Sequence, residues 1–341
     1  MTYRALLVLL ALVLVSASGA SAGKSTAKGG RACSATAKAL FSSCRGEGLD
    51  ALGKATAICL NGDPAAQRDC LAQAKADRTD QASGCKDQFD ARRALCDSLG
   101  EDRYAPNFDA ANFVSDFANP GVSNPYQPLA IDDSWDFASA TETDHIEVLS
   151  DTKLIAGVTC LVVRDRVREG GNLKEDTRDW FALAKNGDVW YCGEEAKDYE
   201  TFAGDAPQDP ELVSIDGSFK AGREGDKPGV IVAAAPVVGQ VFRQEFSVGN
   251  AEDIVEILKT DYVFGQDSTL DELVPQALAD HLCGANCVVT RESSPLEPDT
   301  FERKYYAPGI GVFLEIAPDT GEVNRLVDCN FDSRCGTLPQ P

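Results

Sequence analysis

Two patterns of apolar and polar residues divide the chain into a first and a second part. Residues 31–99 are rich in Ala, Lys, Arg, Asp and Gln and contain one proline, Pro64, which is a composition that favours α-helix. From residue 134 onward short runs alternate apolar and polar residues, as in residues 134–137 and 145–149. Such alternation is typical of strands with one buried face. The pattern therefore predicts an α+β chain with helices first and a mainly antiparallel β domain after them.

Six cysteines in the first part are spaced symmetrically. Their steps of 11, 15, 11, 15 and 11 residues are centred on Asn61-Gly62-Asp63-Pro64, where Gly ends one helix and Asp and Pro begin the next. Eleven residues are about three helical turns, so cysteines eleven apart share a helix face. The spacing predicts an antiparallel α-hairpin stapled by three disulfides, Cys33–Cys96, Cys44–Cys85 and Cys59–Cys70.

The hairpin has little apolar surface to bury, because most of its apolar positions are Ala. A two-helix unit of this kind is marginal alone, and each cross-link adds about 2–4 kcal/mol to its stability. We interpret it as a stabilising N-terminal cap on the second domain, with an interaction arm or spacer as the alternative.

The second part has regularly spaced strands and turns. Lys185-Asn186-Gly187-Asp188 is a hairpin-turn signal, and residues 270–281 are the one segment there with a helical pattern. The spacing predicts a curved sheet, a barrel or a sandwich. Further strand candidates are residues 158–168, 173–184, 189–192, 211–219, 241–246, 254–264, 287–291, 301–306, 312–316 and 323–327.

These patterns set the expected domain boundaries. Residues 1–22 form a signal peptide, with Arg4, an apolar run and the small residues Ala20-Ser21-Ala22 at the cleavage site. The hairpin domain then spans residues 23–100, an extended linker rich in Pro and aromatic residues spans 101–127, and the β domain spans 128–341. We expect a secreted or periplasmic protein, cleaved near Ala22, without membrane insertion.

Twelve cysteines in an exported chain indicate disulfides rather than a metal site. Cys283 and Cys287 are interpreted as a local structural disulfide, with pairing elsewhere as the alternative, and Cys329 with Cys335 as a clasp on the C-terminal tail. Cys160 and Cys192 fall on two strands separated by a third, which places them about 10 Å apart in a regular sheet. A disulfide needs Cα atoms within about 7 Å, so buried free thiols and an unforeseen register both stay open.

Charge is concentrated in the second part. Residues 23–104 have 13 Lys and Arg against 11 Asp and Glu, whereas residues 105–341 have 18 against 43, a net charge of −25. A strongly acidic surface repels nucleic acid and anionic membranes, so we expect neither as a partner.

No catalytic, metal or cofactor motif stands out. The chain has two histidines, His145 and His281, and lacks a G-x-S-x-G elbow, a P-loop, a dinucleotide fingerprint and an EF-hand loop. Adjacent carboxylates such as Glu194-Glu195 are too numerous to single out a catalytic pair. We therefore predict no catalytic residues, no metal ligands and no cofactor, although the acidity is compatible with a surface calcium site.

Several segments resemble a family of exported bacterial proteins of unknown activity. The resemblance covers about residues 124–315 and is found in residues 124–129, 175–181, 186–191 and 304–312. It implies a secreted β-rich domain and brings no activity or site residue with it.

These observations favour a non-enzymatic binding or structural module of the periplasm or cell exterior. We expect the β domain to hold an apolar small molecule or a protein partner, because it has many strands and many aromatic residues. The alternatives are a secreted hydrolase that acts through carboxylates and a calcium-dependent adhesion protein. The aromatic residues concerned are Trp135, Trp180, Trp190, Tyr191, Tyr305 and Tyr306.

Overall fold

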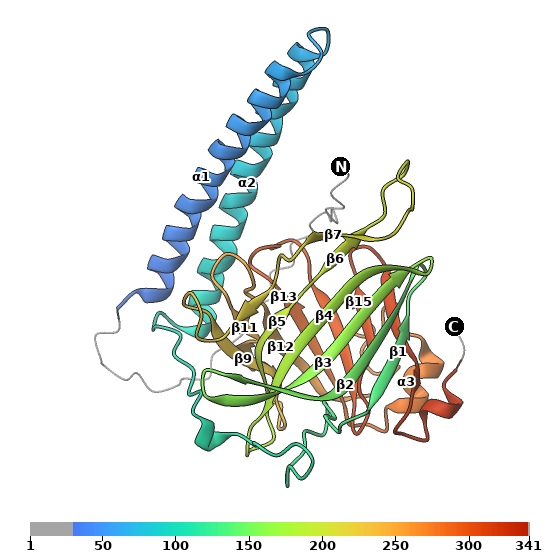
Figure 1. The fold of residues 1–341 in the computed structure, drawn as a ribbon. Helices are drawn as coiled ribbons and strands as arrows, with labels where there is room; N and C mark the ends of the chain where they lie inside the picture. Colours follow the sequence, from blue (N-terminus) through green and yellow to red (C-terminus); the bar gives the residue numbers. More distant parts are fainter. Residues whose placement is uncertain (1–29, 340–341) are drawn as a thin grey trace. The chain divides into compact units, whose positions relative to one another are not determined.

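The computed structural model describes residues 30–339 (Figure 1), so the expected signal peptide and its cleavage site lie outside the described residues. The described chain forms two compact units. The hairpin unit consists of residues 30–105 together with residues 295–298, and the β unit consists of residues 106–294 and 299–339. No helix within residues 30–339 combines the length and the apolar character that a membrane span needs.

The hairpin unit contains helices α1 (Ala32–Asn61) and α2 (Gln67–Leu99). Disulfides join Cys33 to Cys96, Cys44 to Cys85 and Cys59 to Cys70, with Cα–Cα distances of 5.6, 5.7 and 5.6 Å. These are the three cross-links that the cysteine spacing predicts. Helix α2 begins later than Asp63-Pro64 suggests, because residues 64–66 form a turn in which Asp63 accepts a hydrogen bond from the Ala65 N–H.

The β unit is one antiparallel sheet with a short helix, α3 (Gln276–Leu282), and two single 3-10 turns, Ala110–Asn112 and Cys335–Thr337. Its first strands are β1 (Ser134–Ala138), β2 (Glu142–Ile155), β3 (Val158–Glu169), β4 (Asn172–Leu183), β5 (Val189–Glu195), β6 (Asp198–Glu200), β7 (Glu211–Ser214) and β8 (Phe219–Lys220). The later strands are β9 (Lys227–Val232), β10 (Val241–Arg243), β11 (Glu245–Phe246), β12 (Ile254–Tyr262), β13 (Cys287–Ser293), β14 (Glu302–Ala307), β15 (Gly311–Ala317) and β16 (Glu322–Cys329).

The sheet curves until its two ends nearly meet (Figure 1). The strand order is β10-β12-β13-β14-β15-β16-β1-β2-β3-β4-β5-β9-β11, and β10 and β11 are parts of one segment joined at Gln244. The first half of that segment pairs with β12 and the second half with β9, so the segment closes the sheet. At Gly229 on β9 an added Cβ would lie 2.3 Å from the Arg243 carbonyl oxygen. Only glycine allows the backbones to approach so closely there.

Residues 106–127 of the predicted linker belong to the β unit, and residues 101–105 belong to the hairpin unit. Phe113 forms an isolated β-bridge with Ala184, and its ring lies against Trp190 at a centroid distance of 5.7 Å. Phe117 is buried in the largest apolar cluster. Aromatic residues of this segment therefore anchor it to the sheet.

Cys160 and Cys192 form a disulfide with a Cα–Cα distance of 6.7 Å. The ladder between β3 and β4 begins at Leu161, so Cys160 has no register partner on β4. Cys192 is the extra residue in β5 where its register against β4 shifts at Trp180 and Phe181. Ala182 on the intervening strand β4 is fully buried, and its side chain is only a methyl group, so the two cysteines can approach each other over it. The separation of about 10 Å expected from the sequence is too large, because it assumes a regular ladder without the early end of the β3–β4 pairing and without the extra residue in β5.

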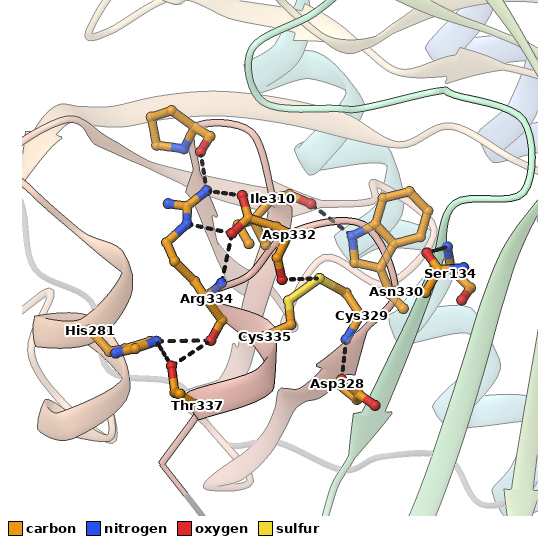
Figure 2. The surroundings of a disulfide bond; sticks show 12 residues. Ser134, His281, Ile310, Asp328, Cys329, Asn330, Asp332, Arg334, Cys335 and Thr337 are labelled. Carbon is orange, nitrogen blue, oxygen red and sulfur yellow. Dashed lines mark hydrogen bonds and ion pairs between the residues drawn. A yellow bond between two sulfur atoms is a disulfide. The ribbon is translucent and has the colours of Figure 1, made fainter.

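The remaining disulfides are local. Cys283 pairs with Cys287 and Cys329 pairs with Cys335. Figure 2 shows how the second of these is surrounded by polar contacts. The Arg334 guanidinium donates two hydrogen bonds to Asp332, at 3.0 and 2.8 Å, and one to the Pro308 carbonyl at 2.9 Å, and the Arg334 backbone N–H donates a third to Asp332 at 2.9 Å. These contacts fasten the C-terminal tail to the sheet.

Candidate functional site

Carboxyl groups gather on the inner face of the curved sheet. Strand register places Asp144 opposite Phe137, Asp165 opposite Ile146, and Asp179 opposite Glu194, all on one face. Asp179 and Lys304 interact electrostatically although five strands separate β4 from β14 in the sheet order. Strands so far apart approach each other only across the inside of the curve. We call the following set, whose members interact electrostatically with one another or with Lys304, the acidic cluster: Asp144, Asp165, Glu175, Asp179, Glu194, Glu292, Glu302 and Glu315.

Lys304 lies among three of these carboxylates. Its Nζ is 3.3 Å from Glu292 Oε2, 3.2 Å from Glu315 Oε1 and 3.9 Å from Glu302 Oε2. Burial lowers the pKa of Lys304, but the three carboxylates outweigh burial and hold that pKa well above its usual value. Lys304 therefore forms ion pairs with three members of the acidic cluster.

Neighbouring polar groups fix the Lys304 partners. The Tyr306 hydroxyl donates to Glu292 Oε1 at 2.8 Å, and the Thr290 hydroxyl donates to the same oxygen at 3.1 Å. The Asn324 amide donates to Glu315 Oε2 at 3.3 Å. The lysine side chain is still 24% exposed, so solvent reaches this part of the inner face.

Asp144 and Asp165 hydrogen-bond to each other, which requires a proton on one of them. Burial raises the pKa of Asp144 to about 6 and raises that of Asp165 well above its usual value, and their hydrogen bond lowers the pKa of Asp144 while it raises that of Asp165. Asp165 is therefore the neutral donor at pH 7 and Asp144 the acceptor. The Oδ1 atoms of both residues are buried, and neither has a hydrogen bond from another group of the described structure.

Asp179, Tyr191 and Glu194 form a second group. The Tyr191 hydroxyl donates to Asp179 Oδ1 at 2.5 Å. Burial raises the pKa of Asp179 to about 7, and burial and the nearby Asp179 raise the pKa of Glu194 to about 8. Each of these carboxyl groups exchanges a proton with solvent near neutral pH, where a bound positive charge stabilises the ionised form.

Apolar side chains continue the same face toward the other end of the strands. On β3, Leu161 and Val163 precede Asp165 at alternate positions, and on β4 Phe181 and Leu183 follow Asp179. The inner face is therefore amphiphilic, with a carboxylate end and an apolar end.

A small pocket lies near the closure of the sheet, lined mainly by apolar side chains that include Tyr126, Phe242 and Tyr306. The pocket has a volume of about 10 Å³, which is room for about one water. The aromatic residues expected to line one cavity belong to three different apolar clusters: Trp135, Tyr191 and Tyr305 to one, Trp180 and Trp190 to another, and Tyr306 to a third.

The two histidines have structural partners. Nδ1 of His145 lies 2.6 Å from Asp136 Oδ1 on the neighbouring strand. Nε2 of His281 lies 3.0 Å from the Arg334 carbonyl oxygen in the C-terminal clasp (Figure 2). Within residues 30–339 there is no group of three His, Cys, Asp or Glu side chains arranged to hold a metal ion.

Sequence reasoning missed the acidic cluster, although a usable signal exists. Asp165 and Asp179 occupy alternate strand positions whose neighbours, Val163 and Phe181, are apolar. A carboxylate at an inward position of a strand is expensive to bury and thus points to function. No known protein family, curated protein or solved structure matches the chain.

Proposed function

We propose that the protein is an exported, non-enzymatic binding module whose acidic cluster binds an organic cation. The observation that supports this proposal is the imbalance of charge on the inner face, where the acidic cluster has eight carboxyl groups and Lys304 interacts with four of them, Asp179, Glu292, Glu302 and Glu315. Enclosed carboxylates without cations are unfavourable, and here the imbalance raises their pKa values. A bound cation relieves that repulsion.

The cation is expected to have an apolar body. The apolar end of the inner face begins two residues from Asp165, at Val163, and two residues from Asp179, at Phe181. These core side chains are packed, with Val163 2% and Phe181 8% exposed, so a short hydrocarbon tail must displace them. Each Å² of apolar surface that the tail then buries adds about 25 cal/mol. The sequence predicts an apolar ligand, and the acidic cluster adds the expectation that this ligand is positively charged.

Export is part of the proposal. Six disulfides fit a protein of an oxidising compartment, extracellular or periplasmic. The expected signal peptide and cleavage near Ala22 remain predictions.

Calorimetric titration tests the ligand class. Hexylammonium, hexanol and hexanoate have similar tails and different charges, so the proposal expects affinity in that order at pH 8. The Asp179→Asn and Glu194→Gln double variant should bind hexylammonium at least about tenfold more weakly, because each lost charge-assisted contact is worth about 1.5–3 kcal/mol. A matched control is Glu322→Gln, at an exposed strand end. Equal affinity for hexylammonium and hexanoate would exclude the proposal.

A second candidate is the carboxylate-dependent hydrolase, which the Asp144–Asp165 pair favours. A protonated carboxyl hydrogen-bonded to an ionised one is the arrangement used for general acid and base catalysis. Chromogenic glycosides and peptides of several types test it, since the wild-type chain should cleave one of them and Asp165→Asn should abolish the cleavage. Cleavage that persists in Asp165→Asn, or no cleavage by wild type, removes this candidate.

A further inference from the structure

Two lysines lie over the same aromatic ring on the outer face of the sheet. The Nζ atoms of Lys153 and Lys220 are 3.9 and 4.6 Å from the centroid of the Trp180 ring. Lys153 is on β2, Trp180 on β4 and Lys220 on β8, and strand register places the latter two opposite the same residue, Gly193. Cation–π attraction holds each ammonium near the ring face.

Neither ammonium is neutralised by a carboxylate. Among the residues that the structure describes, no Asp or Glu oxygen lies within 4.0 Å of either Nζ. By contrast, Lys174 Nζ is 3.0 Å from Glu169 and Lys259 Nζ is 3.2 Å from Asp261. In a unit with so many acids, two adjacent lysines without an acidic partner are exceptional.

The two ammonium groups also repel each other. Burial, contact with Lys153 and repulsion from Lys153 and Arg223 lower the pKa of Lys220 to about 8. Glu195 raises this pKa, with less effect than the groups that lower it, and is itself paired with Lys197 at 3.4 Å, while Asp226 accepts a hydrogen bond from the Lys220 backbone N–H at 3.4 Å. A bound anion beside the Lys153 and Lys220 ammonium groups would therefore be stabilised.

The backbone around Lys220 is firmly held. The Ala221 N–H donates to the Cys192 carbonyl at 2.9 Å, and the Arg223 N–H donates to the Lys220 carbonyl at 3.0 Å. Gly222 has a φ of +84°, and an added Cβ there would lie 3.3 Å from the Cβ of Ala156 in the β2–β3 turn. The disulfide Cys160–Cys192 lies on the same face, in the same apolar cluster as Trp180. The cations are thus placed by a rigid part of the unit.

We propose that Lys153 and Lys220, with Arg223 beside them, form a binding site for a free, compact oxyanion such as phosphate or sulfate. An oxyanion between the two ammonium groups replaces their repulsion with charge-assisted hydrogen bonds. Trp180 is 3% exposed, so its ring supports the lysines and is not available for stacking with the ligand. This site is separate from the acidic cluster, which lies on the opposite face of the sheet.

Calorimetric titration of the secreted chain with inorganic phosphate or sulfate tests the proposal, with chloride and acetate as comparison anions. Wild type should show saturable phosphate binding, and the Lys153→Met and Lys220→Met double variant should bind at least about tenfold more weakly, since charged hydrogen bonds are lost. Lys174→Met and Lys259→Met are matched controls that should bind as wild type does. Absence of saturable binding in wild type, or equal binding by the double variant, would overturn the proposal.

A measurement on wild type alone avoids dependence on the folding of a variant. In NMR titrations of the labelled lysine side chains, phosphate should raise the pKa of Lys220, while chloride at equal ionic strength should not. An unchanged pKa of Lys220 in saturating phosphate would equally overturn the site.

Discussion

The protonated carboxyl of Asp165 donates a hydrogen bond to the carboxylate of Asp144 on the neighbouring strand of the inner face. Strand register explains the contact, because Ile146 lies opposite Asp165 and Asp144 is two residues earlier on the same face. The pair shows that the chain tolerates acids on its inner face by keeping some of them neutral.

The stability of the β unit should therefore depend on pH. Burial raises the pKa values of Asp144, Asp179 and Glu194 to about 6, 7 and 8 in the folded state, whereas unfolded carboxyl groups titrate near 4. Between these values the folded chain binds more protons, so its free energy of unfolding falls as pH rises from about 5 to about 8. Urea unfolding across this range measures the slope. The Asp179→Asn and Glu194→Gln double variant should flatten it, and an increase in stability toward pH 8 would contradict the assignment.

Lys304→Met should destabilise the protein. It leaves Glu292 and Glu315 without their cation, and because the site is partly exposed we expect a loss of about 2–3 kcal/mol, below the value for fully buried pairs. The control Lys259→Met removes an exposed pair with Asp261 and should cost under about 1 kcal/mol. Chemical unfolding of both variants provides the comparison, and equal losses would show that Lys304 has no special electrostatic role.

Gly229→Ala should weaken the closure of the sheet. Its Cβ would lie 2.3 and 2.4 Å from two backbone oxygens, of Arg243 and Gln244, so the strands must move apart. We expect a loss of at least about 2 kcal/mol, as for other steric insertions into packed sites. Gly336→Ala is the control, because nothing lies within 4 Å of its added Cβ. Thermal unfolding at equal concentration should give a lower melting temperature for Gly229→Ala than for Gly336→Ala. Equal melting temperatures would contradict the role of Gly229 in closing the sheet.

A peptide map of the non-reduced protein should join Cys160 to Cys192 and show no free thiol. Replacing both cysteines with Ala should lower stability by about 2–4 kcal/mol, the usual value for a disulfide of this kind. The same map tests the hairpin, because a peptide that joins Cys33 to Cys44 would rule out its three cross-links.

Regular elements were predictable from the sequence, and irregular ones were not. The hairpin cross-links follow from helical periodicity, and the antiparallel order of β2 to β5 follows from alternation and from turns such as Asn186-Gly187. The Cys160–Cys192 contact depends on an extra residue in one strand, which no pattern of apolar positions announces. The acidic cluster depends on which strands face each other across the closed sheet. Asp179 and Lys304 are 125 residues apart, and only the fold brings them together.

The central claim is that an organic cation binds to the acidic cluster, whose carboxyl groups are partly protonated at neutral pH when no cation is bound. It is tested most directly by titrating hexylammonium into the protein at pH 7 in two buffers of different ionisation enthalpy. Binding should lower the pKa values of groups such as Asp179 and Glu194 and release protons, and this release should shrink in the Asp179→Asn and Glu194→Gln double variant. Binding heats that are identical in the two buffers, or no binding at all, would contradict the account.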